Sequence, residues 1–192
     1  MITKKTKSHS KLYLGIDPAS DGAAVALFNG AAVYATMWRK VRRKSRTYYE
    51  VREIVVGNPK NRMFQAKRFS EVGNFIAQSE FLGQHDVHLS AEDAYFKPNA
   101  KTTIALSRLS GAIVAPIELK FDVDAKWVRA ADWRHKVLRL NPFTPRQQAK
   151  NASLKLMPSL VSGIYEIMNR LGRYDHITDA SGVAYWAYQK NK

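Results

Sequence analysis

Cysteine is absent from the 192-residue chain. Its absence excludes a disulfide framework and any reaction that proceeds through a thiolate. The chain also lacks an apolar run approaching the roughly 20 residues that span a membrane as a helix, so we expect no membrane association. Residues 1–11 are polar and basic and lack the apolar centre of a signal peptide, so we expect a mobile basic tail and a protein that is not secreted.

Acidic residues are scarce relative to basic ones. The chain has 16 Asp and Glu against 31 Lys and Arg, and its formal net charge is +15. This excess favours a polyanionic partner, nucleic acid above all, and the alternative is a basic surface without such a partner. Hydrophobic residues make up 45% of the chain, which is enough for a substantial core, and the length favours a single domain over residues 12–190.

Two short stretches, Leu12–Asp17 and Val87–Glu92, each predict a buried strand with one carboxylate at its carboxyl end. Side chains alternate along a strand, so Asp17 and Glu92 each leave the face that carries the aliphatic stripe of its strand. A predicted helix precedes the second stretch, and such a crossover implies that this strand pairs parallel to an earlier one. If the two strands are neighbours, the two carboxylates converge.

The remaining hydrophobic patterns predict strands and helices in a mixed order. Asn29-Gly30 suits a tight turn, so residues 23–28 and 31–38 are expected to complete a three-stranded antiparallel meander. Further strands are expected over residues 50–56 and 121–127, and helices over residues 62–81, 101–115, 130–140, 144–157, 159–171 and 175–188. We therefore expect an α/β fold with a central mixed five-stranded sheet, an antiparallel meander followed by parallel strands, flanked by helices.

A basic stretch follows the meander. Six of the eight residues from Arg39 to Arg46 are Lys or Arg, and Tyr48 and Tyr49 come next. Basic residues beside aromatic ones suit phosphate contact combined with base stacking, so Arg42 and Arg43 are candidate DNA-binding residues. A solvated charged loop would explain the same composition.

The last predicted helix carries His176 and Asp179 one turn apart, and residues three apart on a helix share a face. Together with Asp17 and Glu92 they would form an oxygen-rich site with one nitrogen, which suits Mg²⁺ or Mn²⁺ better than zinc alone. Two such ions roughly 4 Å apart can activate water and stabilise the leaving oxygen in phosphodiester cleavage. The pattern therefore predicts a metal-dependent nuclease whose basic surface holds the phosphates.

Each of the four residues alone has an ordinary structural explanation. Asp17 precedes Pro18 and could be a turn former, and Glu92 could be solvated or salt-bridged. Asp179 could cap a helix, and His176 could be a surface or capping residue. Three further acids lie close by and rank lower as ligands: Asp21, Asp93 and Asp175. Asp21 sits in a turn, and Asp93 points to the opposite strand face from Glu92.

Four motifs, in this order, resemble the RuvC Holliday junction resolvases. They are Leu14-Gly15-Ile16-Asp17-Pro18, the run Ala91-Glu92-Asp93-Ala94-Tyr95-Phe96-Lys97-Pro98-Asn99, Leu109-Ser110-Gly111-Ala112-Ile113-Val114-Ala115, and His176-x-x-Asp179-Ala180. The resemblance covers the chain from about Leu12 to Tyr188. It implies a ribonuclease H-like fold, a homodimer, and symmetric nicking of a four-way DNA junction that depends on Mg²⁺, with Mn²⁺ able to substitute.

The resemblance also assigns roles to individual residues. Asp17, Glu92, His176 and Asp179 match the family's catalytic, metal-binding quartet. The remaining assignments are DNA contacts, near the junction or the scissile phosphate: Tyr95, Phe96, Lys97, Arg134 and Lys150. The chain departs from the family in having Ala19 where a glycine is usual, in a longer and more basic stretch over residues 39–59, and in its basic tail.

The activity and setting follow from the resemblance. We expect a structure-selective endonuclease that is cytoplasmic or nucleoid-associated, and such a compact version would suit a bacteriophage or an organelle. Two alternatives stay open: another ribonuclease H-like nuclease acting on branched DNA or RNA–DNA hybrids, and a junction-binding protein without activity. The intact quartet argues against the second, because carboxylates that face DNA cost affinity unless a metal ion neutralises them.

Overall fold

The computed structural model describes residues 10–43, 46–58, 61–93, 100–172 and 174–192. Its strands form one mixed sheet in the order β5-β4-β3-β2-β1-β6-β7. The strands are β1 (Lys11–Asp17), β2 (Gly22–Phe28), β3 (Ala31–Arg43), β4 (Arg46–Val55), β5 (Arg62–Ala66), β6 (Asp86–Glu92) and β7 (Lys126–Val128). The helices are α1 (Phe69–Ala77), α2 (Ala100–Phe121), α3 (Ala130–Leu138), α4 (Arg146–Leu160), α5 (Ile164–Leu171) and α6 (Tyr174–Lys190), with a short 3-10 turn at Leu82–Gln84.

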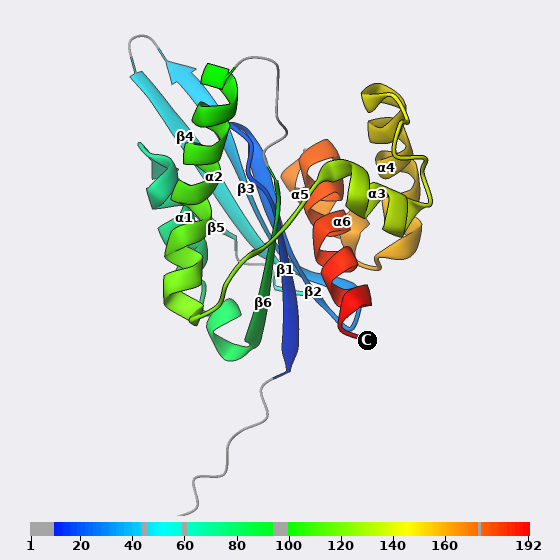
Figure 1. Cartoon of the computed structure of the whole chain (residues 1–192). Coiled ribbons are helices and arrows are strands. Elements are labelled where there is room, and N and C mark those ends of the chain that lie inside the picture. Colours follow the sequence, from blue (N-terminus) through cyan, green and yellow to red (C-terminus); the bar gives the residue numbers. More distant parts are fainter. Residues whose placement is uncertain (1–9, 44–45, 59–60, 94–99, 173) are drawn as a thin grey trace, which may run out of the picture.

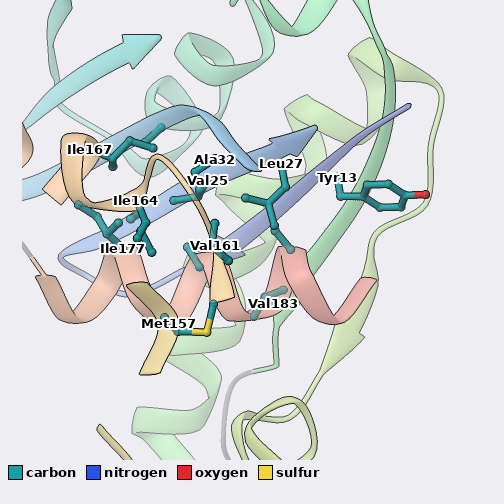
Figure 2. Packing of buried hydrophobic residues seen from close by; sticks show 14 of the residues in the cluster. Tyr13, Val25, Leu27, Ala32, Met157, Val161, Ile164, Ile167, Ile177 and Val183 are labelled. Carbon is teal, nitrogen blue, oxygen red and sulfur yellow. The ribbon is translucent and has the colours of Figure 1, made fainter. Parts of the chain in front are cut away.

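The sheet lies between two layers of helices (Figure 1). On one face α1 and α2 pack against a core that includes Leu14, Ile16 and Leu89. On the other face α3, α4, α5 and α6 enclose a second core, and Figure 2 shows Val25 and Val183 among its members. Among the described helices none is both long and apolar enough to cross a membrane.

The pairing of the strands follows the expected sequence of an antiparallel meander and then parallel strands. β2 pairs antiparallel to β1 and to β3, whereas β6 pairs parallel to β1 and β7 pairs parallel to β6. The expected mixed α/β architecture is therefore confirmed. The expected number of five strands is wrong, because β4 and β5 add to the meander and give seven strands in the described part of the chain.

Two segments differ from their predicted secondary structure. The basic stretch is not a loop, because Arg39–Arg43 continue β3 and pair in register with β4 as far as Arg46. The predicted helix over 62–81 is divided: Arg62–Ala66 pairs with β4 as β5, and α1 begins only at Phe69. The hydrophobic stripe that predicted one helix is core only in part, since Met63 is 64% exposed.

Other element boundaries shift by smaller amounts. The expected strand over 121–127 is reduced to β7, because α2 continues through Pro116 to Phe121. The helix expected from residue 144 has Pro145 at its N-cap and runs through Pro158 to Leu160. A separate α5 follows after Gly163, whose φ of 80° is a left-handed conformation that favours glycine.

The fold brings the predicted site residues to one edge of the sheet. β1 and β6 are parallel neighbours, so Asp17 and Glu92 end at the same edge. α6 packs directly on β1, because a Cβ on Gly15 would overlap the carbonyl oxygen of Ala180. Gly15 and Asp17 share a face of β1, so this close contact sets the first turns of α6 beside Asp17.

Candidate active site

The four predicted catalytic residues gather where β1, β6 and the first turns of α6 meet. Nδ1 of His176 lies 2.6 Å from Oδ2 of Asp17, a distance at which the protonated ring nitrogen donates a hydrogen bond. Asp17 and Asp179 are buried, and the pKa of Glu92 is raised first by its own burial and then by the negative charges of these two residues. The three carboxylates are therefore close enough to interact although they come from three different elements.

Each carboxylate accepts a hydrogen bond from a different donor. His176 donates to Asp17. Nε1 of the Trp133 indole donates to Oε2 of Glu92 at 2.9 Å, and a guanidinium nitrogen of Arg134 donates to Oδ2 of Asp179 at 2.9 Å. Two of the three donors are neighbours on α3, so this helix holds two of the carboxylates in place.

The position of α3 depends on a glycine in α6. Trp133 is fully buried, and a Cβ on Gly182 would overlap its indole ring. The Arg134 guanidinium, which is also buried, lies 5.0 Å from the Trp133 ring centre and makes a cation–π contact with it. The absence of a side chain at residue 182 therefore lets the Trp133 and Arg134 pair reach the carboxylates.

The proton affinities of the cluster reflect burial and crowded negative charge. Removal of the Glu92 carboxyl from water, followed by the charges of Asp17 and Asp179, raises its pKa to about 8. Burial likewise raises the pKa of Asp179 to about 6, although the Arg134 charge acts in the opposite direction. Burial disfavours the His176 cation, but the hydrogen bond and charge of Asp17 outweigh it and raise the His176 pKa.

The donor set fits a hard divalent cation in chemistry and charge. Three carboxylates and one imidazole are ligands that Mg²⁺ or Mn²⁺ accepts, and a dication would offset the repulsion that raises the Glu92 pKa. Oδ1 of Asp179 is buried without a hydrogen-bond partner and is therefore available to an ion. Arg134 occupies the other oxygen of Asp179, Oδ2. In the described part of the chain no three His, Asp or Glu side chains are already arranged to hold a metal ion.

The remaining predicted residues fall into three places. Arg134 is inside the cluster. Nζ of Lys150 lies 3.4 Å from Oδ2 of Asp175, which in turn lies 3.9 Å from Nε2 of His176, so Lys150 borders the site. Arg42 and Arg43 are exposed on β3. The three others lie outside the described residues: Tyr95, Phe96 and Lys97.

The lower-ranked acids have other contacts. A side-chain oxygen of Asp21 accepts a hydrogen bond from the Lys40 backbone N–H at 2.7 Å. The backbone N–H of Asp93 donates to the Val128 carbonyl at 2.9 Å. Asp175 reaches the quartet through its contact with His176.

The sequence analysis did not identify Trp133 or Gly182 as parts of the site. A weak signal for Gly182 was present, because it lies three residues after Asp179 and so shares its helix face. No comparable local pattern identified Trp133, since its contact with Glu92 spans 41 residues. Arg134 was predicted to contact DNA, and its ion pair with Asp179 was not foreseen.

No protein-family model and no curated protein sequence matches the chain. Among solved structures, the chain is similar to T. thermophilus RuvC in complex with Holliday junction substrate, with a TM-score of 0.49 and 10% sequence identity. The similarity covers 94% of this chain and 95% of that chain. At this level the likeness assigns neither an activity nor any residue role to this chain.

Proposed function

We propose that the protein is a divalent-metal-dependent, structure-selective endodeoxyribonuclease of the RuvC-like, ribonuclease H-like type that resolves four-way DNA junctions. The observation that supports this most is the convergence of Asp17, Glu92 and Asp179, with His176, at one sheet edge. The chain has a net charge of +15. A buried cluster of carboxylates is nevertheless unfavourable unless positive groups compensate its negative charge. The order of the motifs along the chain supports the same assignment.

In this proposal Asp17, Glu92 and Asp179 would hold Mg²⁺, with Mn²⁺ able to substitute, and His176 would either join them or orient the attacking water. The bound ion would supply Lewis-acid stabilisation of the phosphate charge and would lower the pKa of water. Hydrolysis adds water across one P–O bond and leaves a phosphate monoester and a hydroxyl. Asp17 fixes the orientation of the His176 ring through Nδ1, so Nε2 is the nitrogen left to meet water or substrate.

Arg134 has a separate part in this mechanism. Its guanidinium supplies a positive charge to Asp179, 2.9 Å from Oδ2. A metal ion held by Asp179 would supply that charge instead, and the Arg134 guanidinium would then be free to contact a phosphate. This exchange of partners reconciles the position of Arg134 in the cluster with its predicted DNA contact. Lys150, at the border of the site, would remain a phosphate ligand throughout.

A homodimer is the proposed assembly, because two sites are needed to nick two opposing strands. The outer face of α2 supports it. Small residues and exposed apolar side chains share that face, with Ile104 51% exposed and Leu119 85% exposed near its two ends. Burial of this face against a second copy would remove it from water.

The proposal is tested by cleavage of a labelled four-way junction with a mobile core, beside a linear duplex and an RNA–DNA hybrid, in Mg²⁺. We expect paired, symmetric nicks in the junction alone. Cleavage of the hybrid or of other branched DNA instead would identify a different ribonuclease H-like nuclease. Tight junction binding without any cleavage in Mg²⁺ or Mn²⁺ would identify a non-catalytic junction-binding protein.

A further inference from the structure

The hairpin formed by β3 and β4 continues beyond the rest of the sheet (Figure 1). The last pair between β2 and β3 is Gly22 with Trp38, and β5 pairs with β4 no further toward the tip than Tyr49. Beyond these points the two strands pair only with each other in the described part of the chain. We call this segment, Arg39–Arg43 and Arg46–Tyr49, the β3–β4 arm.

The β3–β4 arm begins at the edge of the sheet that carries the candidate active site. Asp17 is opposite Ala23 in the pairing of β1 with β2, and Ala23 is opposite Met37 in the pairing of β2 with β3. Arg39 lies two residues beyond Met37 and therefore starts on the same face. β3 runs in the same direction as β1, so the arm extends outward from the edge at which Asp17 ends.

Positive charge dominates the β3–β4 arm. The exposed residues of the arm include five cations: Arg39, Lys40, Arg42, Arg43 and Arg46. Glu50, at the base, already pairs with Arg39 and Arg52. Arg43 is directly opposite Arg46, and like charges in that position are destabilising.

The arm gains little from packing to offset this repulsion. Val41 opposite Tyr48 is its apolar cross-strand pair, and a two-stranded ribbon is only marginally stable in water. Tyr49 is buried against Phe69, with ring centres 4.4 Å apart. The predicted base stacking is therefore wrong for Tyr49, and Tyr48 is half-buried beside Val41. What the arm offers a partner is cationic charge rather than exposed rings.

The shape of the arm selects among polyanions. Lys40 and Arg42 lie on one face, and Arg39 and Arg43 lie on the other, so both faces carry charge. From Arg39 to Arg43 the ribbon extends about 13 Å at the usual rise of a strand. A two-stranded ribbon fits the major groove of B-DNA, about 12 Å wide, where phosphates line both walls. A cationic ribbon with charge on both faces matches that arrangement.

We propose that the β3–β4 arm binds the groove of one double-helical DNA arm and holds it beside the candidate active site. This inference rests on the proposed function for the class of polyanion. The contacts are to phosphates, so they do not require a branch point or a metal ion. The arm would therefore supply duplex affinity, while the carboxylate cluster and its neighbours would act at the junction.

The test measures binding of a labelled duplex and of a single strand of equal length, in EDTA, at several salt concentrations. The variant replaces Arg42, Arg43 and Arg46 with Gln. The matched control replaces three exposed lysines, at the start of β1 and in the last turns of α2 and α6, with Gln: Lys11, Lys120 and Lys190. Both variants lose three positive charges, and the unfolding temperature of each shows whether it is folded.

We expect the arm variant to bind duplex at least about tenfold more weakly and its salt slope to fall by about 2 to 3, since each lost phosphate contact removes about 0.9. The control should change duplex affinity about threefold or less, because the salt-screened charges are remote from the contact. Equal losses in the two variants, or an equal loss for duplex and single strand, would overturn the inference.

The same experiment separates this inference from the proposed function. If wild-type protein cleaves junctions but the arm variant binds duplex as wild type does, the arm proposal fails and the nuclease proposal stands. If the arm variant loses duplex binding while wild-type protein cleaves no junction, the arm proposal stands and the nuclease proposal fails. Wild-type protein that binds no duplex at all would overturn the arm proposal.

Discussion

At the candidate active site three carboxylates each accept a hydrogen bond from the protein, whereas the β3–β4 arm carries five exposed cations, of which Arg39 pairs with Glu50 at the base. His176, Trp133 and Arg134 serve the carboxylates. On the arm, two arginines even face each other across the strands. The net charge of +15 is thus distributed unevenly, and the two regions differ in how they tolerate unbalanced charge.

The difference follows from access to water. An exposed guanidinium keeps its hydration and is screened by salt, so several can gather at a modest cost. A buried carboxylate loses its hydration and must either bind a donor or take up a proton. The site uses both remedies, with three donors and a pKa of Glu92 raised to about 8. Under the proposed function, a bound metal ion would supply the positive charge that Arg134 now provides to Asp179.

The largest effect is expected for Asp17→Asn. Loss of a charged ligand should lower junction cleavage at least about 1000-fold, equivalent to several kcal/mol of transition-state stabilisation. Junction binding in EDTA should be unchanged or tighter, because one negative charge near the phosphates is removed. Cleavage rates and binding curves on one junction measure both. A fully active variant would remove Asp17 from the site.

Arg134→Gln should show whether the guanidinium stabilises Asp179 without metal and competes with a metal ion for it. Without metal the variant should be destabilised by about 3 kcal/mol, because a buried carboxylate loses its partner. Its affinity for Mg²⁺ should increase, by about tenfold if the lost competition amounts to 1.4 kcal/mol. Calorimetric titration and chemical unfolding measure the two effects.

The matched control for Arg134 is Arg129→Gln, at the N-cap of the same helix. Arg129 is exposed and pairs with Asp132 at 2.8 Å, so its loss should change stability far less than Arg134→Gln does and leave Mg²⁺ affinity unchanged. Weaker Mg²⁺ binding by Arg134→Gln would show that the guanidinium supports the metal site instead of competing with the ion.

Gly182→Ala tests whether Trp133 must lie against α6. The added methyl group overlaps the indole, and such overpacking should cost about 1–3 kcal/mol of unfolding free energy. Cleavage should fall as well, because the indole can no longer hold Glu92. Gly83→Ala is the control, since a Cβ there meets nothing within 4 Å. Equal stability of the two variants would mean that α3 shifts without cost.

A pH dependence of stability without metal is also expected. Glu92 and Asp179 have raised pKa values in the folded protein, about 8 and about 6, so the folded state retains protons that the unfolded state releases. Stability should therefore fall as pH rises from 5 to 8. The His176 contribution has the same sign, because its raised pKa gives stability that is lost as pH rises.

Melting temperatures of wild type and Glu92→Gln measure this dependence. Each kcal/mol should shift the melting temperature by about 2–4 °C in a chain of this size. The variant should show a flatter profile, and Mg²⁺ should raise the wild-type value most at pH 8. Parallel profiles for the two proteins would contradict the raised pKa of Glu92.

Local patterns were sufficient for the parts of the site that depend on strand parity and helix periodicity. The alternation around Asp17 and Glu92 predicted the face of each strand that carries the carboxylate, and the spacing of His176 and Asp179 predicted their shared helix face. The hydrogen bond to Glu92 was out of reach, because it depends on how α3 packs against α6. That packing is set by a missing side chain at Gly182, far along the chain.

The same distinction applies to the fold. The crossover before β6 predicted parallel pairing, which the structure confirms. The pattern around Met63 fits a helix and a strand equally well, and pairing with β4 decides between them. Charge misled the analysis of residues 39–46: a run of cations suggested a loop, but β pairing requires only that the backbone finds a partner, and the hairpin supplies one.

The most direct test of the metal centre is a Mg²⁺ titration followed through the indole N–H signals in NMR spectra. The signal of Trp133, identified by its loss in Trp133→Phe, reports on Glu92 through their hydrogen bond. The account predicts that this signal shifts and saturates at millimolar Mg²⁺ in the wild-type protein and does not respond in Asp17→Asn. An unmoved Trp133 signal in the wild-type protein, with or without junction DNA, would contradict the assignment of a metal ion to these carboxylates.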